Sequence, residues 1–308
     1  MNANIKLFKS IELFEKTILK KPVDILYHRI VEKDINGNNG KLKDKVVIIT
    51  GASSGIGRAL AIEFAEKGAK VVLAARNYAE LVKLKNQIRE NGGKSIFFIT
   101  DVTKKDDCKK LINSTLDIFG KIDILINNAG ISMRANFADL ELFVIQNVMD
   151  TNFYGTVFCT KYALPHILKQ KGSIIGISSI SGLTPLPGRT AYVASKFAMD
   201  GFLETIRIEN FKRGLHVMLV HPGFTASNIR NVALNEKGES QKETPRNEAK
   251  MMTAEKLAKI ISKATVNRKR NIIVGIQGKI AVWMHKNFPA VTDKLIYYEM
   301  SKEPNSPF

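Results

Sequence analysis

The 308-residue chain has few of the residues that cross-link secreted proteins or bind metals. Its two cysteines, Cys108 and Cys159, stand far apart without a CxxC pair, which excludes a disulfide framework and a thiolate metal site. The histidines show no ligand spacing, so we expect no zinc site; they are His28, His166, His216, His221 and His285. A reducing compartment fits this composition best.

Long apolar segments are also lacking. No run of about 18 apolar residues occurs, and the N-terminus lacks the apolar stretch and small-residue cleavage site of a secretory signal. A content of 44% hydrophobic and 25% charged residues is ordinary for a globular chain. We therefore expect a folded cytoplasmic protein, either soluble or peripheral to a membrane.

Acidic residues are scarce beside basic ones. The chain has 47 Lys and Arg against 29 Asp and Glu, a formal charge of +18. Such an excess attracts nucleic acid, anionic lipid or phosphorylated cofactors, and charge alone does not choose among them. The lysines are scattered, without zinc-finger spacing or an aromatic RNA-binding signature, so we expect no specific nucleic-acid partner.

From Lys45 onward, short β-branched runs alternate with longer helical patterns, which predicts βαβ units. The expected strands are 46–50, 71–75, 95–99, 122–127, 173–178, 216–221 and 271–274. About seven such strands separated by helices predict a Rossmann-like, doubly wound, mostly parallel sheet with helices on both faces. We assign residues 41–308 to one domain.

Two segments fall outside this rhythm. In residues 1–40, Leu7, Ile11, Phe14 and Ile18 recur at helical spacing among lysines, which predicts a basic amphipathic helix over 1–21 and then a linker. This helix would either rest on an anionic membrane or pack on its own domain or a partner subunit. Residues 224–252 are polar and follow a strand, where we expect a substrate lid.

A glycine-rich loop connects the first strand to a helix. Its spacing is GxxxGxG, from Gly51 through Gly55 to Gly57. Glycine lets backbone approach a pyrophosphate, and the helix beginning near Ile56 offers free N–H groups and a positive dipole end. The loop therefore favours nucleotide binding over a simple turn.

The second strand ends at Arg76, where enzymes that prefer NAD need an acidic residue for the adenosine 2′-hydroxyl. A guanidinium there is suited instead to a 2′-phosphate. Arg76 thus predicts NADP(H) as the cofactor ahead of NAD(H), the alternative being a solvated residue in a turn.

Tyr192 and Lys196 are separated by one helical turn and share a helix face. A free tyrosine ionises near pH 10, and an ammonium beside it favours the phenolate, which brings its proton within reach of neutral-pH chemistry. By itself the YxxxK pattern is common, and a plain surface pair would be the favoured interpretation of it.

Taken together, five segments resemble the short-chain dehydrogenase/reductase family over residues 43–275. They are the loop 50–57, Asp101-Val102, the Asn127–Gly130 segment, Tyr192-x-x-x-Lys196 and Pro222-Gly223. The resemblance implies hydride transfer between nicotinamide and a carbonyl or secondary alcohol, with no metal. The catalytic set it implies is Asn152, Ser179, Tyr192 and Lys196, with Ser178 as the rival to Ser179.

The same resemblance implies a cofactor site. Asp101 and Val102 would contact the adenine and Asn128 its ribose, although Asn127 and Asn128 could also only tie strands together. The full expected set is Gly51, Ser53, Ser54, Gly55, Ile56, Gly57, Arg76, Asp101, Val102, Asn128, Tyr192, Lys196, Pro222, Gly223 and Thr225. His221 precedes Pro222 and is expected to border the nicotinamide pocket. Family members commonly form dimers or tetramers.

The substrate is not readable from the sequence. The segments 74–77 and 181–198 look most like hydroxysteroid-type reductases, which favours an apolar alcohol or ketone, and a 3-oxoacyl or 3-ketosphinganine reductase would read almost identically. A rival class is a non-catalytic nucleotide-binding or scaffold protein on the same fold.

Overall fold

The computed structural model describes residues 40–308 except 228, 242–243 and 245–250. Leu42–Phe308 form one compact unit. The amphipathic helix expected in residues 1–21 lies outside the described residues. Among the described helices, none is both long and apolar enough to cross a membrane.

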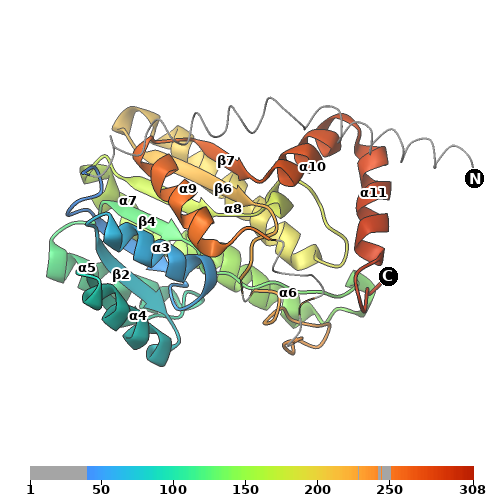
Figure 1. The fold of residues 1–308 in the computed structure, drawn as a ribbon, viewed down its shortest axis with the longest axis horizontal. Helices are drawn as coiled ribbons and strands as arrows, with labels where there is room; N and C mark the ends of the chain where they lie inside the picture. The colour runs from blue at the N-terminus through green and yellow to red at the C-terminus, as the bar shows by residue number, and fades with distance from the viewer. Residues whose placement is uncertain (1–39, 228, 242–243, 245–250) are drawn as a thin grey trace, which may run out of the picture. The chain divides into compact units, whose positions relative to one another are not determined.

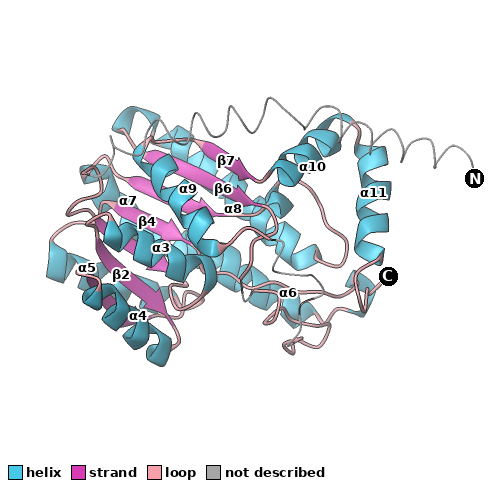
Figure 2. Ribbon diagram, viewed as in Figure 1, coloured by secondary structure: helices cyan, strands magenta, loops and turns pink. Residues whose placement is uncertain are grey.

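A single parallel sheet forms the centre of this unit (Figures 1 and 2). Its seven strands lie in the order β3-β2-β1-β4-β5-β6-β7. Their bounds are β1 Val46–Thr50, β2 Lys70–Ala75, β3 Lys94–Ile99, β4 Ile124–Asn127, β5 Ser173–Ile177, β6 His216–Pro222 and β7 Asn271–Val274. All seven coincide with expected strands, with ends displaced by two residues at most. The doubly wound fold predicted from the sequence is confirmed.

Successive residues of β1 and β2 point to opposite faces of the sheet, and each face is apolar. Val47, Ile49 and Leu73 pack with α3 Gly55–Glu66, α4 Tyr78–Glu90 and α9 Ala254–Val266. Val46, Ile48 and Val72 pack with α5 Lys105–Phe119, α7 Gly155–Lys169 and α8 Thr190–Glu209. Because both faces are covered, the strands are apolar throughout rather than alternating.

Shorter elements complete the described chain. They are η1 Phe137–Asp139, α6 Leu142–Met149, the π-helical η2 Asp150–Tyr154, η3 Ile180–Gly182, η4 Phe211–Arg213, α10 Ile276–Asn287 and α11 Pro289–Ser301. The last two extend beyond the sheet next to β7 (Figure 1). Trp283 of α10 and Phe288, which connects α10 to α11, are exposed.

The order of the strands reverses between β1 and β4, which pair directly but connect onward to opposite sides of the sheet. Loops that follow these two strands diverge, so a crevice opens at their carboxyl ends. This is where a doubly wound sheet places its ligand.

Asp123 lies just before β4, at the amino ends of the strands and opposite the crevice, and it is 2% exposed. Its carboxylate accepts hydrogen bonds from Lys45 Nζ at 2.8 Å and the Val46 N–H at 2.9 Å, and pairs with Lys121 at 3.0 Å. Burial alone would raise the pKa of this carboxyl, but the bonds from Lys45, Val46 and Lys121 outweigh it and lower the pKa.

We predict that Asp123→Asn lowers the free energy of unfolding at pH 7 by about 2 kcal/mol. Because the pKa of the folded state is depressed, the carboxylate stabilises the fold above about pH 4 and ceases to do so as the pH falls further. Urea titrations at several pH values should show the wild type and the variant converging in acid. The exposed Asp117 provides a matched control, and Asp117→Asn should change stability by under about 0.5 kcal/mol.

Candidate active site

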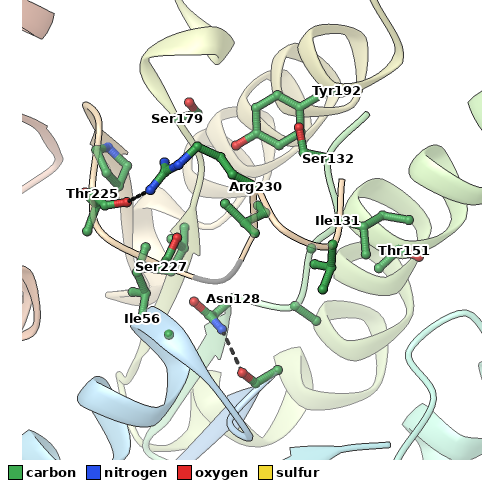
Figure 3. Close-up of a pocket in the computed structure, with 18 of the residues that line it drawn as sticks. Ile56, Asn128, Ile131, Ser132, Thr151, Ser179, Tyr192, Thr225, Ser227 and Arg230 are labelled. Carbon is green, nitrogen blue, oxygen red and sulfur yellow. Dashed lines mark hydrogen bonds between the residues drawn. The ribbon is translucent and has the colours of Figure 1, made fainter. Parts of the chain in front are cut away.

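One cavity of about 510 Å³ lies at the carboxyl ends of the strands. Figure 3 shows Ser179 and Tyr192 on one side of it, Asn128 and Ile56 on the other, and the Arg230 side chain between them. Of the residues expected to bind cofactor, all except Gly57 line this cavity. The structure therefore brings the segments that follow β1 to β6 together in one site.

The glycine loop fits closely against the segment after β4. Gly51 and Gly55 have φ angles of 65° and 51°, which other residues adopt rarely. At Gly57, a Cβ would lie 2.3 Å from the Gly51 carbonyl oxygen and 2.5 Å from Asn128 Nδ2. Gly57 thus packs beneath the loop while Gly55 opens α3 toward the cavity, so the three glycines shape a cradle for a phosphate group.

Asn128 ties the end of β4 to β1, whereas Asn127 ties β4 to α7. Asn128 Nδ2 donates to the carbonyl oxygens of Thr50 at 2.9 Å and Gly51 at 3.2 Å, and its N–H donates to Thr50 Oγ1 at 3.0 Å. Asn127 Nδ2 donates to Thr160 Oγ1 at 3.1 Å, and Asn127 does not line the cavity. Asn128 alone therefore combines a structural bond with a place in the cavity wall.

Where β2 and β3 end, the cavity is lined by Arg76, Asp101 and Val102. Arg76 follows β2 and is exposed, so its guanidinium is accessible to a ligand. Asp101 Oδ1 accepts bonds from the Thr103 N–H at 3.1 Å and Thr103 Oγ1 at 2.8 Å, which fixes the turn after β3. Val102 is buried against Gly155. No carboxylate follows β2 in the place that a 2′-hydroxyl would need.

Ser178 and Ser179 follow β5, and their side chains differ in environment. Ser179 Oγ accepts a bond from the Ser181 N–H at 3.1 Å, which starts η3, and interacts with the Tyr192 hydroxyl. The Ser178 residue is 4% exposed, and its Oγ lies against Gly182. The interaction with the tyrosine distinguishes Ser179 from its rival.

Tyr192 and Lys196 lie on α8, with Lys196 Nζ 5.7 Å from the centre of the tyrosine ring. Nζ donates to the Ile177 carbonyl oxygen at 2.8 Å, and burial lowers the pKa of the ammonium to about 8, against the opposing effect of Asp200. Burial also raises the pKa of Tyr192, and Ser179, Arg189 and Arg230 offset only part of that rise. The downward shift of the tyrosine pKa expected from Lys196 is not found, because desolvation of the phenolate is the larger effect.

Asn152 is fully buried in the π-helical turn η2. Its Nδ2 donates to the Ile131 carbonyl oxygen and to Ser195 Oγ, both at 2.9 Å, and its Oδ1 accepts from the Ile131 N–H at 2.8 Å. A Cβ at Gly130 would meet Asn152 Oδ1 at 3.2 Å and Lys196 Nζ at 3.6 Å, so both side chains border the same glycine. A π turn at this point is consistent with a functional role.

The end of β6 and the segment after it form the third side of the site. Pro222, Gly223 and Thr225 line the cavity, and Thr225 Oγ1 donates to the Gly223 carbonyl oxygen at 3.3 Å. The described part of 224–252 pairs with the 132–134 segment, since the Leu234 N–H donates to the Ser132 carbonyl oxygen at 2.9 Å and the Arg134 N–H to the Leu234 carbonyl oxygen at 2.8 Å.

His221 does not border the cavity, contrary to the expectation from its neighbour Pro222. Its residue is 1% exposed, and its Nε2 lies 2.8 Å from Asp200 Oδ2. Odd and even positions of a strand face opposite sides, so His221 points into the packing beside α8. Among the described residues, no cluster of potential ligands could hold a metal ion.

Several lining residues were missed by the sequence analysis. The positive charges of Arg189 and Arg230 act to lower the pKa of Tyr192. Arg230 Nη2 also donates to the Thr225 carbonyl oxygen at 2.9 Å. Met300 and Glu303 reach the cavity from α11 and the segment after it. The position of Arg189 just before the helix of Tyr192 was an available signal, whereas nothing in the local sequence indicated the C-terminal pair.

Comparison with known proteins is consistent with this arrangement. A family model for the short chain dehydrogenase matches residues 45–238. The chain is 33% identical over 270 residues to 11-beta-hydroxysteroid dehydrogenase A of Sesamum indicum, covering 84% of this chain and 77% of that protein. It is 34% identical over 278 residues to an uncharacterised oxidoreductase of Bacillus subtilis, covering 87% of this chain and 77% of that protein.

Solved structures share the fold. A short chain dehydrogenase/reductase of Burkholderia phymatum, in complex with NAD, superposes with a TM-score of 0.74 at 24% identity over 82% of this chain and 96% of that one. An alcohol dehydrogenase of Thermococcus sibiricus, complexed with 5-hydroxy-NADP, gives 0.65 at 22% identity, over 75% and 96%. With its family model spanning β1 to the segment after β6, the chain belongs to the short-chain dehydrogenase/reductase family.

Proposed function

We propose that the protein is an NADP(H)-dependent oxidoreductase that interconverts an apolar ketone and its secondary alcohol. The observation that carries this proposal is the position of Tyr192, Ser179 and Lys196 in the cavity that the glycine loop also lines. A scaffold protein on the same fold would need the loop but not the hydroxyl pair beside a buried ammonium.

The residues present fit a dinucleotide. The cradle of Gly51, Gly55 and Gly57 leaves no room for a Cβ at Gly57 and exposes the start of α3 to a pyrophosphate. Asp101, Val102 and Asn128 would line the adenosine, with Arg76 on its 2′-phosphate. Pro222, Gly223 and Thr225 would border the nicotinamide, whose ribose hydroxyls Lys196 would hold.

The bound nicotinamide would supply or accept the hydride. On the protein side, Ser179 would donate a hydrogen bond to the substrate oxygen and Tyr192 would give that oxygen its proton in reduction or take it in oxidation. Asn152 would anchor the route by which Lys196 exchanges protons with solvent. In reduction, the raised pKa of Tyr192 keeps the phenol protonated at neutral pH, which is the form that a proton donor needs.

The cavity that Tyr192 lines also has apolar walls, formed by Ile180, Leu186, Ile229, Val232 and Met300. This supports a steroid-like, 3-oxoacyl or 3-ketosphinganine-like ketone, and the similarity to a hydroxysteroid dehydrogenase favours the first. Purified protein with NADPH should be screened against steroids, retinal, 3-oxoacyl esters and ketosphinganine. Nicotinamide turnover with none of these, despite tight cofactor binding, would favour a non-catalytic nucleotide-binding protein.

We predict that Tyr192→Phe loses turnover by about a thousandfold while its affinity for NADPH stays near that of the wild type, because the phenol transfers the proton but is not the main cofactor contact. Lys196→Met should impair both. Stopped-flow fluorescence gives cofactor binding, and steady-state assays give kcat. Retained turnover in the phenylalanine variant would remove Tyr192 from its assigned role.

We predict a preference for NADPH over NADH, and Arg76→Asp should reduce the ratio of the two affinities by about tenfold or more. The substitution removes a guanidinium–phosphate pair and adds repulsion. Fluorescence titration with both cofactors gives the ratio. Equal or tighter NADH binding by the unmodified protein would contradict the assignment of Arg76.

We further propose that residues 1–21 form the basic amphipathic helix expected from the sequence and rest on anionic membrane. Residues 224–252 would be the substrate lid. Residues 41–308 would be a catalytic domain that assembles as a dimer or tetramer. Apolar substrates are delivered from lipid, which is consistent with this arrangement. Binding to anionic but not neutral vesicles, weakened by salt and abolished by deleting residues 1–40, is the expected outcome. Unchanged vesicle binding, or loss of the oligomer after the deletion, would show that the helix packs on its own domain or on a partner subunit instead.

A further inference from the structure

The buried carboxylate of Asp200 takes no part in the proposed reaction, yet it lies one helical turn beyond Lys196 on α8. Residues spaced by four share a helix face, so the two side chains project in the same direction. The Asp200 residue is 7% exposed and that of Lys196 is 3% exposed. A carboxylate and an ammonium are thus buried on one helix face, the lysine in the cavity wall and the aspartate outside the lining.

Asp200 is held from two further elements. His221 of β6 lies with its Nε2 2.8 Å from Asp200 Oδ2. At Gly182 of η3, a Cβ would lie 2.5 Å from the same oxygen. The carboxylate is therefore confined between α8, β6 and the turn that follows Ser179, and the missing side chain of Gly182 makes its space.

The surroundings of Lys196 supply few other charges. Nζ donates to the Ile177 carbonyl oxygen of β5 and faces the Tyr192 ring, while Asn152 of η2 approaches it across Gly130. Of the charged groups that act on the neighbouring Tyr192, Arg189 and Arg230 are cations and Asp200 is the anion. Asp200 is thus the acidic group that favours the charged lysine, and it opposes the burial that lowers the pKa of Lys196 to about 8.

We propose that Asp200, oriented by His221, is a positioning residue that keeps the Lys196 ammonium charged at neutral pH. The role of that ammonium in holding cofactor belongs to the proposed function above. The charge of the lysine is a separate matter, and it can be measured without cofactor or turnover.

The titration of Lys196 contributes to the pH dependence of stability. A folded-state pKa of about 8 lies below the value of about 10.4 for a free lysine, so between these pH values the unfolded chain binds the proton that the folded chain has released. This contribution to the free energy of unfolding therefore rises with pH across this window. Cys159 and Tyr192 act in the opposite direction, because the hydrogen bond with Cys108 and burial raise the pKa of the thiol, and burial raises the pKa of the phenol. They lower stability only above about pH 8.5 and about pH 10, respectively. Comparison of the wild type with Lys196→Met separates the contribution of Lys196 from theirs.

The experiment is a series of urea titrations of the unliganded protein from pH 6 to pH 10, with NADPH affinity measured by fluorescence over the same range. Relative to Lys196→Met, the wild type should gain stability from about pH 8 upward, and its NADPH affinity should fall severalfold through the same pH. Asp200→Asn, which keeps the shape of the side chain, should move both transitions down by about one pH unit.

His221→Ala should move the transitions in the same direction by less, because the carboxylate remains but loses its partner. Since the histidine acts through Asp200, adding His221→Ala to Asp200→Asn should move them no further. Lys196→Met should remove the rise in stability. Glu63→Gln removes another buried carboxylate, bonded to Ser262 on the far side of the sheet, and should leave both transitions in place.

Transitions that stay within about 0.2 pH units of the wild type in a folded Asp200→Asn protein would overturn the proposal, as would a further shift in the double variant. If Asp200→Asn does not fold, His221→Ala decides the matter through the same transitions. Absence of NADPH binding by the wild type would count against the proposed function alone, because the stability series still measures the charge of Lys196.

Discussion

The parallel pairing of β1 with β4 is the constraint on which the rest of the molecule depends. The chain continues from these neighbours toward opposite edges of the sheet, and the crevice between their following loops is the cavity. Thr50 and Asn128 lock this junction, because the Thr50 hydroxyl accepts two backbone N–H groups and the Asn128 amide donates to the glycine loop. The cofactor loop is therefore positioned by a bond across the sheet as well as by its own glycines.

Burial of charge is the second constraint, and it acts at both ends of the sheet. Asp123 is stabilised by two lysines and a backbone N–H at the edge opposite the cavity. Lys196 has instead a carbonyl oxygen and a more distant carboxylate, so its charged form is weakly favoured. The first arrangement contributes to stability, whereas the second lowers the pKa of a group that lines the cavity, as is common at functional sites.

The sheet and the main motifs could be predicted because their signals are local. Strand positions follow from apolar runs between turn residues, and the bounds of β1 and β7 match the expected ranges. Glycine spacing indicated the loop, and Tyr192 and Lys196 share a helix face by periodicity alone. Arg230, Met300 and Glu303 could not be placed in the same way, because their positions depend on how distant loops and α11 meet at the cavity.

The sequence by itself determined the order of elements, the doubly wound sheet and the residue types at the site, since these depend on periodicity and on chemistry within a few residues. Only the tertiary structure decided how each side chain is solvated. It turned His221 away from the cavity toward Asp200, and it raised the pKa of Tyr192 where its neighbour Lys196 predicted the reverse. The physical reason is that the desolvation of a group depends on every element packed around it, and those elements are distant from the group in the sequence.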